Sequence, residues 1–213
     1  MKFVSRQDGG RQLGKFLRKR GISADLVLGL PRGGVVVAAE VARELKTPLD
    51  ILVVRKIGHP LQREFAVGAL VEPDFIFLHE ASLREFPVNP ADLDDVIAEE
   101  KNRLTEYSRQ FHFSGMPSLD GKKVLLVDDG LATGATMEAA ALSVRQQNAR
   151  RIIVAAPTAS ADAVEKLRRV ADVIEILFVD KNFQAVGQYY REFSQTTDKE
   201  VVSLLRDSVA RAA

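Results

Sequence analysis

The segment VLLVDDGLATGAT occupies residues 124–136 and carries the most informative pattern of the chain. Its four apolar residues read as a buried strand, which ends in two adjacent carboxylates, Asp128 and Asp129. A short turn of small and hydroxylated residues follows, and the Ala-rich stretch at 135–147 then reads as a helix. A strand, a tight turn and a helix in this order are typical of α/β folds, in which ligands bind at the carboxyl ends of the strands.

The rest of the chain repeats this alternation of short apolar runs and amphipathic stretches. A first helix starts at Ser5 and is ended by Gly21. Residues 79–120 form a helical insertion, in which a helix starts at Asn89. We expect strands at 25–30, 49–54, 75–78, 123–127, 151–156 and 173–179, and helices at 35–45, 135–147, 161–169 and 198–210. The predicted fold class is therefore α/β, with a mostly parallel twisted sheet flanked by helices in a single domain, 1–213.

The turn at 130–136 has the properties of a phosphate-binding site. Unpaired backbone N–H groups and the positive end of the helix dipole attract a phosphate at a helix N-terminus. Gly134 permits close approach of the backbone, and two threonines add hydroxyl donors. The two carboxylates would repel a phosphate, and acceptors side by side suit the vicinal hydroxyls of a ribose. Taken singly, each acid has a simpler interpretation that we would favour: the first is a solvated strand end and the second is a helix N-cap.

Two further segments follow strands of the same expected sheet. The turn Pro-Arg-Gly-Gly at 31–34 follows the first core strand, and its consecutive N–H groups can form a nest for an anion beside the charge of Arg32. Arg55 and Lys56 begin a loop, 55–63, that follows the second strand. Each segment also has a simpler interpretation: a tight strand-to-helix turn for the first, and a solvated strand end for the two basic residues of the second.

Composition and charge exclude several classes of protein. The 213 residues are 46% apolar and 28% charged, which is typical of a soluble globular domain. The chain has no Cys, which excludes disulfides, Cys-ligated metals and thiol nucleophiles, and its three His lie far apart without ligand spacing. We read no membrane span and no signal peptide, so we expect a cytoplasmic protein without membrane contact. The net charge of +1 argues against bulk nucleic-acid binding.

The segment 124–136 resembles the loop that binds 5-phosphoribosyl 1-pyrophosphate (PRPP) in the type I phosphoribosyltransferases. The shared pattern is four apolar residues, two acids, two variable residues and then Ala/Thr-Thr-Gly-x-Thr, and Gly130 departs from it where the family often has an apolar residue. Nearly the whole chain resembles a bacterial branch of predicted phosphoribosyltransferases, through LPRGG at 30–34, VRKIG at 54–58 and the aromatic segment at 183–193. A Walker A loop is absent and no GxGxxG follows an expected strand, which disfavours nucleoside triphosphates and dinucleotides as ligands.

The resemblance implies a type I phosphoribosyltransferase fold with a small hood, supplied by the insertion at 79–120, by the C-terminal segment at 180–213, or by both. It implies a PRPP site made of Asp128, Asp129, Gly130, Leu131, Ala132, Thr133, Gly134, Ala135 and Thr136. It implies pyrophosphate binding by Pro31, Arg32, Gly33, Gly34, Arg55 and Lys56. The catalytic residues would be Arg55, Lys56, Asp128 and Asp129.

The activity implied by the resemblance is transfer of the 5-phosphoribosyl group from PRPP to a nitrogen acceptor, first of all a nucleobase, with release of pyrophosphate. Mg²⁺ would enter with PRPP, held by substrate oxygens and water with no direct protein ligand. Two alternatives stay open. One is a regulator that senses PRPP and binds nucleic acid or protein without turnover, favoured by the basic segment 1–20. The other is a plain phosphate-binding domain. The opposite charges of 1–20 and 92–106 also permit a homodimer.

Overall fold

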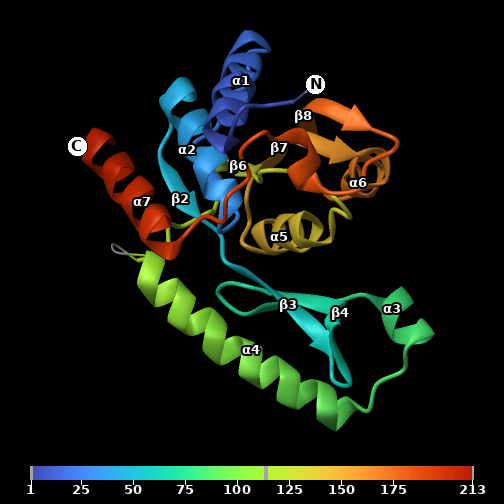
Figure 1. Ribbon diagram of the computed structural model, residues 1–213. Coiled ribbons are helices and arrows are strands. Elements are labelled where there is room, and N and C mark those ends of the chain that lie inside the picture. The colour runs from blue at the N-terminus through green and yellow to red at the C-terminus, as the bar shows by residue number, and fades with distance from the viewer. Residues whose placement is uncertain (1, 113–114, 213) are drawn as a thin grey trace.

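A five-stranded parallel sheet forms the centre of the computed structural model, which describes residues 2–112 and 115–212 (Figure 1). The strands lie in the order β2-β1-β6-β7-β8. Their bounds are β1 (Leu26–Gly29), β2 (Leu49–Ile51), β6 (Lys123–Val127), β7 (Arg151–Ser160) and β8 (Val173–Asp180). This is the mostly parallel sheet that the alternation of elements predicts, so the α/β fold class is confirmed.

Helices cover both faces of this sheet (Figure 1). One face carries α1 (Arg6–Lys19), α2 (Gly33–Leu45) and α7 (Asp198–Ala212), and the other carries α5 (Ala135–Gln146) and α6 (Ala161–Leu167). The strand side chains alternate between the two cores, so that Val27 and Leu125 pack with α1 and α2, whereas Leu28 and Leu126 pack with α5. Among the described residues, no helix is both long enough and apolar enough to cross a bilayer.

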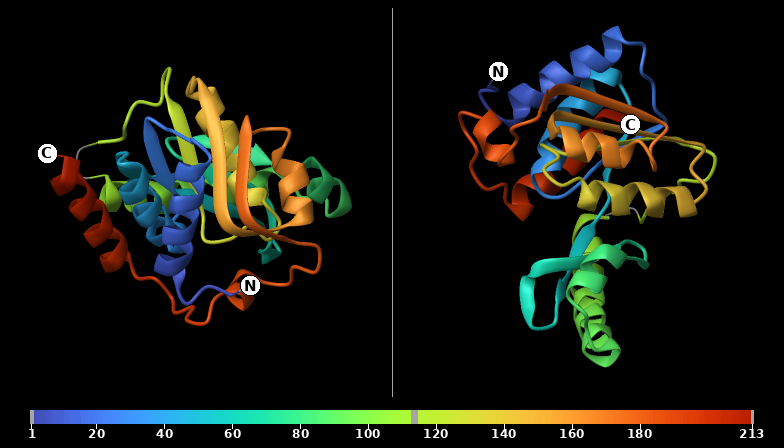
Figure 2. Two further views of the ribbon diagram at one scale, coloured as in Figure 1. Left: turned by 90° about the horizontal axis from the view of Figure 1, so that it is seen from above. Right: turned by 90° about the vertical axis from the view of Figure 1, so that its right-hand side faces the viewer.

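A second, smaller lobe lies below the parallel sheet (Figures 1 and 2). Its antiparallel sheet has the order β3-β4-β5, with bounds β3 (Val54–His59), β4 (Gln62–Val71) and β5 (Phe75–Leu78). The long helix α4 (Pro90–Phe111) packs on one side of this sheet, and α5 lies between its other side and the parallel sheet. The short helix α3 (Glu80–Glu85) follows β5. Residues 113 and 114 of the insertion expected at 79–120 lie outside the described residues.

A hairpin takes the place of the loop that the sequence predicts at 55–63. β3 ends at His59 and β4 begins at Gln62, so the two strands are joined by a tight turn. The pairing shifts register beside Gly58, where a Cβ atom would lie 2.2 Å from the carbonyl oxygen of Arg63. The prediction of a loop is therefore wrong. Gly58 and Pro60, which indicate a loop in the sequence, lie in a β-bulge and in the hairpin turn instead.

The predicted helix ends agree with the observed caps. The Ser5 side chain accepts a hydrogen bond from the Asp8 N–H at 3.3 Å, which caps α1, and Gly21 lies just beyond this helix with φ +69°. The Asn89 side chain accepts from the Ala91 N–H at 3.1 Å and caps α4, as the sequence predicts. Between the caps, the apolar periodicity places the buried side of each helix on its sheet.

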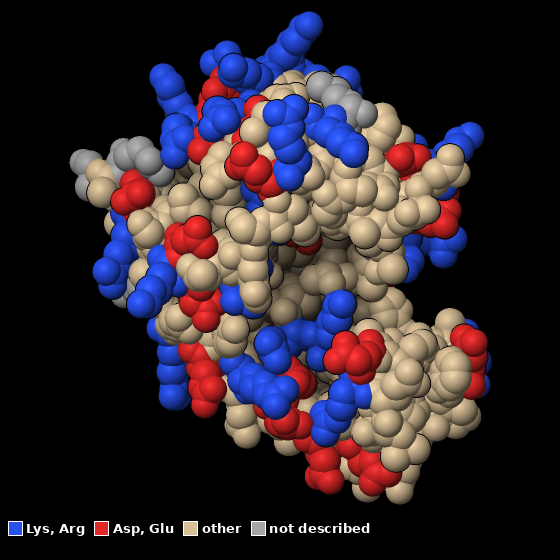
Figure 3. Space-filling view, viewed as in Figure 1, with Lys and Arg blue, Asp and Glu red and all other residues tan. Residues whose placement is uncertain are grey.

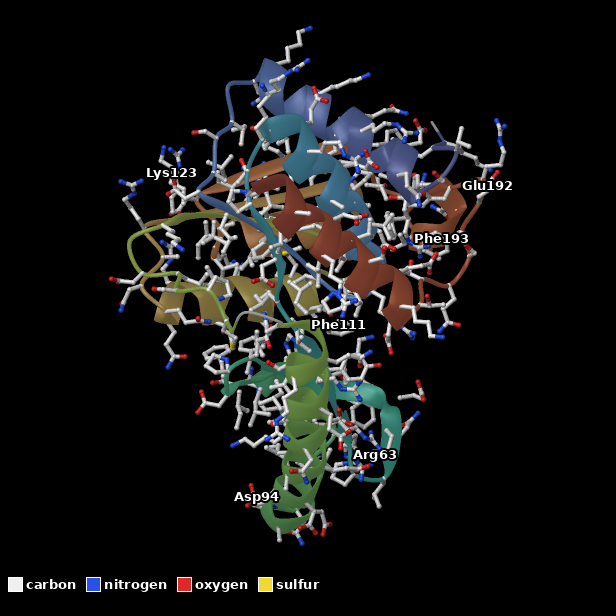
Figure 4. All side chains as sticks on the ribbon, turned by 90° about the vertical axis from the view of Figure 1, so that its left-hand side faces the viewer. Arg63, Asp94, Phe111, Lys123, Glu192 and Phe193 are labelled. Carbon is white, nitrogen blue, oxygen red and sulfur yellow. The ribbon has the colours of Figure 1, made fainter. Side chains whose placement is uncertain are left out.

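A buried cluster around His112 joins the two lobes. His112 follows Phe111, which lies at the end of α4 nearest the parallel sheet (Figure 4). Its Nε2 lies 3.0 Å from Oε1 of Glu72, and its Nδ1 lies 3.2 Å from Oδ1 of Asp50. The same Glu72 oxygen accepts a hydrogen bond from the Val53 N–H at 2.7 Å. Burial alone would lower the pKa of His112, but the carboxylates of Asp50 and Glu72 beside its ring raise it to about 9.

We predict that this cluster makes stability depend on pH above neutrality. A histidine whose pKa rises from 6.5 to about 9 on folding stabilises the protein fully below 6.5, and this contribution is lost as the pH rises through 9. The free energy of unfolding should therefore fall by up to about 3 kcal/mol across that window. Urea denaturation at a series of pH values measures the fall.

Two variants identify the histidine responsible. His112→Gln should be less stable at pH 6 and should lose most of the pH dependence, because glutamine carries no titrating charge between the two carboxylates. His59→Gln, in the β3–β4 hairpin, should keep the wild-type slope. An unchanged slope in the His112 variant would contradict the assignment.

Candidate functional site

The two turns singled out in the sequence emerge side by side from the parallel sheet. β1 and β6 are neighbours, and their last residues, Gly29 and Val127, are register partners. The Leu30 N–H donates to the Val127 carbonyl at 2.9 Å, which keeps the chains together as they leave the sheet. The turn at 31–34 and the turn at 128–134 therefore share one edge of the sheet, the carboxyl edge at which α/β proteins bind ligands.

The second turn ends in a helix N-terminus that is open to an anion. Gly134, the N-cap residue of α5, has φ +72° and makes no side-chain cap, so a non-glycine residue would be strained there. The Thr133 hydroxyl accepts from the Ala135 N–H at 3.4 Å and lies beside the same turn. Backbone N–H groups and the positive end of the α5 dipole can therefore hold a phosphate at this position.

The extended end of β7 supports this turn. β7 continues to Ser160, beyond the predicted end of that strand at 156. The Leu131 N–H donates to the Thr158 carbonyl at 3.0 Å, and the Ser160 hydroxyl donates to the Ala132 carbonyl at 2.6 Å. The strand is longer than its apolar run because it pairs with the turn as well as with β8.

A cavity of about 280 Å³ opens in front of the turn, between the two lobes. Figure 3 shows the hollow between the lobes, with Lys and Arg side chains gathered on the small lobe below it. The cavity is lined by Lys56, Ala66, Gly68, Ala69, His79, Asp128 and residues 130–137. All the residues expected to bind PRPP line this cavity, except Asp129.

Asp128 and Asp129 lie at the end of β6 in different surroundings. The Asp129 N–H donates to Oδ1 of Asp128 at 2.8 Å, and Asp128 reaches the cavity. Arg6 donates from Nε to Oδ2 of Asp129 at 2.6 Å, and the Tyr190 hydroxyl donates to the Asp129 carbonyl at 2.5 Å. Burial and the neighbouring carboxylate raise the pKa of Asp128 well above its usual range. Burial also raises the pKa of Asp129, while Arg6 partly offsets that rise.

The turn at 31–34 packs directly on the two acids. A Cβ atom at Gly33 would lie 2.1 Å from Oδ2 of Asp129, and one at Gly34 would lie 2.7 Å from Oδ1 of Asp128. α2 begins here without a side-chain cap and without an acid in its first turn, so its positive end faces both carboxylates. The Pro31–Arg32 peptide bond is cis. The Arg32 guanidinium lies 3.8 Å from Asp198 at the start of α7.

Only one of the two basic residues of β3 lines this cavity. Lys56 lines the cavity in front of the turn at 130–136. Arg55 points to the opposite side of the strand, where its Nε donates to Oε2 of Glu100 on α4 at 2.8 Å. Neighbouring residues of a strand alternate in direction, so only one of this pair can face the cavity. Among the described residues that line this cavity, Lys56 is the one Lys or Arg.

Sequence reasoning misses two residues of this site. Arg6 carries no local signal, because its partner Asp129 is 123 residues away. His79 also lines the cavity, and burial lowers its pKa, while the charge of Glu138 partly opposes that fall. In the aromatic segment at 183–193, Tyr190 is a core residue that is buried against Phe3.

The chain resembles known proteins over most of its length. A family model described as a phosphoribosyl transferase domain matches residues 6–194. A curated protein of Mycobacterium tuberculosis strain H37Rv, named "putative phosphoribosyl transferase", is 41% identical over 204 residues, which cover 95% of this chain and 46% of the relative. The chain therefore spans about half the length of the curated relative that it matches.

Solved structures share this architecture. The crystal structure of TT1426 from Thermus thermophilus is 42% identical, covers 97% of this chain and 99% of its own, and superposes with a TM-score of 0.82. The structure of AQ2163 from Aquifex aeolicus is 12% identical, covers 85% of this chain and 78% of its own, and has a TM-score of 0.52. At 12% identity, the likeness to AQ2163 concerns the fold alone.

We predict that a methyl group at Gly33 disrupts the contact between the two turns. In Gly33→Ala, the added carbon would overlap Oδ2 of Asp129 and lie 2.6 Å from Nε of Arg6, so the ion pair must shift. The free energy of unfolding should fall by about 1–3 kcal/mol in urea denaturation. The matched control is Gly9→Ala, where the nearest atoms of Pro157 and Tyr190 are 3.3 Å away. An equal loss in both variants would contradict the prediction.

Proposed function

The chain belongs to the phosphoribosyl transferase family, and from the arrangement of its site we propose that it transfers the 5-phosphoribosyl group of PRPP to a nitrogen acceptor with release of pyrophosphate. The acceptor we propose is a nucleobase, which would place the protein in nucleotide metabolism. The single observation that carries the proposal is the cavity of about 280 Å³ in which the phosphate-binding turn, Asp128 and Lys56 meet.

Each part of PRPP has a matching part of the site. The 5-phosphate fits the N-terminus of α5 at residues 132–136, where backbone N–H groups and the helix dipole attract an anion. The ribose hydroxyls suit Asp128, whose carboxylate reaches the cavity. The pyrophosphate suits the turn at 31–34 and the N-terminus of α2, which lie against the acids on the other side.

Positioning and charge neutralisation account for the catalysis that we propose. The carbon–oxygen bond between ribose C1 and pyrophosphate breaks while the acceptor nitrogen forms its bond to C1, so no covalent protein nucleophile is required. Negative charge builds on the departing pyrophosphate, and Lys56 is placed to neutralise it. The small lobe that carries Lys56 lies below the hollow (Figure 3) and would keep water from that side of a bound substrate.

The site fits magnesium that arrives with the substrate. Among the described residues there is no group of three or more His, Cys, Asp or Glu side chains that could enclose a metal ion. Asp128 alone brings a carboxylate to the cavity, so oxygens of PRPP and water would supply most of the ligands. The ion would neutralise charge on the pyrophosphate when bound.

Calorimetric titration with PRPP and MgCl₂ tests the proposal directly. The wild type should bind, and Asp128→Asn/Asp129→Asn should lose about a hundredfold or more in affinity, because one amide replaces the Asp128 carboxylate that faces the cavity and the other replaces the Asp129 partner of Arg6. Asp207→Asn on the exposed side of α7 is the control and should bind normally.

The outcomes separate the candidate functions. Release of pyrophosphate with a nucleobase would support the transferase. Binding of PRPP without turnover across a panel of bases would favour a sensor of PRPP. No binding by a folded wild type would contradict both.

A second prediction concerns the two basic residues of β3. Lys56→Gln should weaken binding of PRPP–Mg by about tenfold, because it removes a charge from the cavity while leaving the fold intact. Arg55→Gln should keep the affinity within about threefold and should lower thermal stability instead, because it leaves the buried Glu100 short of a partner. The reverse pattern would show that Arg55 is the residue that meets pyrophosphate.

A further inference from the structure

His79 lines the same cavity as the phosphate-binding turn at 130–136. It follows β5, and its backbone N–H donates to the Val67 carbonyl at 2.8 Å, which attaches the residue to β4. Its ring lies edge-on to Phe77, with the ring centres 4.8 Å apart and the ring planes at 77°. The small lobe therefore holds this imidazole at the wall of the cavity.

The ring of His79 has no hydrogen-bond partner in the described part of the chain. His79 is the N-cap residue of α3, but its side chain makes no capping hydrogen bond. The other two histidines are engaged, since Nδ1 of His59 accepts from the Leu61 N–H at 3.2 Å and His112 lies between two carboxylates. Both ring nitrogens of His79 are therefore available to a ligand or to water in the cavity.

The surroundings of this ring keep it neutral when no ligand is bound. Burial lowers the pKa of His79, the charge of Glu138 on α5 partly opposes the fall, and the charge of Lys166 on α6 adds to it. Two further charged residues line the cavity, and an ion pair lies on α3: Lys56, Asp128 and Glu80–Arg84. Because the pKa lies below its usual value of 6.5, the imidazole carries no charge at pH 7.

A phosphate at the turn would carry more negative charge than the turn can neutralise. A phosphomonoester has a charge of about −1.5 to −2 at pH 7, whereas a helix N-terminus supplies about +0.5. Residues 130–136 contain no Lys or Arg, and the proposed function places Lys56 at the pyrophosphate. A dianion in the cavity would raise the pKa of a neighbouring histidine, so that binding itself would supply a positive charge.

We propose that His79 is a ligand of the phosphate bound at the N-terminus of α5, and that its ring takes up one proton from solvent when the phosphate binds. The inference rests on the proposed function and adds to it a side-chain ligand for the 5-phosphate of PRPP. In the complex, the imidazolium donates a hydrogen bond to a phosphate oxygen. A charge-assisted hydrogen bond of this kind is shorter and stronger than one from a neutral donor. Binding of PRPP is therefore coupled to the uptake of a proton.

NMR titration of the wild type measures this proton directly. Inorganic sulfate is the probe, because it stays a dianion between pH 6 and pH 9 and only the protein titrates. The amide chemical shifts of Thr133 and Gly134 report when sulfate saturates the turn, and the pKa of the His79 ring should then have risen by about 1–2. The chain has three histidines, so His79→Gln assigns the signal. The pKa of His59, in the hairpin, should not change.

The pH dependence of sulfate affinity tests the same coupling in matched variants. Asp128 also reaches the cavity and has a raised pKa, so Asp128→Asn is the background for the whole series. In this background, affinity should fall about tenfold or more between pH 6 and pH 9, because a ligand that raises a pKa binds the protonated form more tightly. Adding His79→Gln should weaken binding at pH 6 and leave it unchanged at pH 9, since glutamine keeps a donor but carries no charge. Adding His59→Gln should preserve the fall, because His59 does not line the cavity.

A rise in the pKa of His79, together with a pH dependence that His79→Gln abolishes, supports the inference. An unchanged pKa under saturating sulfate would overturn it, and that measurement needs no variant to fold. An equal fall in affinity with and without His79→Gln would also overturn it, as would the absence of any sulfate-induced shift at Thr133 and Gly134. Failure of PRPP–Mg to bind a wild type that meets the sulfate expectations would instead overturn the proposed function and leave the histidine contact standing.

Discussion

Two carboxylates buried side by side, Asp128 and Asp129, impose the strongest constraint on this structure. Buried charges are tolerated only where positive groups and hydrogen bonds compensate them. Here the compensation comes from Arg6 on the first helix and from the N-terminus of α2. The C-terminal segment adds Tyr190, which binds the Asp129 backbone and packs beside the ion pair. Segments from the start, the middle and the end of the chain therefore meet at one point because the acids lie there.

The fold could be predicted from the sequence where its signals are local. The strand at 123–127 is observed as expected, because an unbroken apolar run suits a strand that is buried on both faces. The cap at Asn89 likewise marks the start of α4. Gly58 fails as a signal, because a glycine in a loop and a glycine in a β-bulge look alike until the partner strand is known. The β3–β4 hairpin therefore lies where the sequence predicts a loop, whereas β5 is observed at the strand expected at 75–78.

The site could be predicted only in part, for a similar reason. The turn at 130–136 is one continuous segment, so its hydroxyls, glycine and helix start are visible together in the sequence. Arg55 and Lys56 look equivalent until the strand is placed, and its alternation then sends them to opposite faces. Arg6 could not be found at all, because no periodicity links it to Asp129 across the sheet. Long-range ion pairs leave no trace in a single sequence.

The position of each residue along the β3–β4 hairpin determines how far it would move if the small lobe rotated. The chain enters this lobe at Val53, beside Glu72 and His112, so a rotation of the lobe would pivot near that cluster. Lys56 lies three residues from the pivot, whereas Leu61 lies eight residues away at the tip and is 91% exposed. At about 3.3 Å per residue, a tilt that moves the tip far would move Lys56 much less. A rotation of the lobe would therefore change the distance between Lys56 and the phosphate-binding turn much less than it would move the tip.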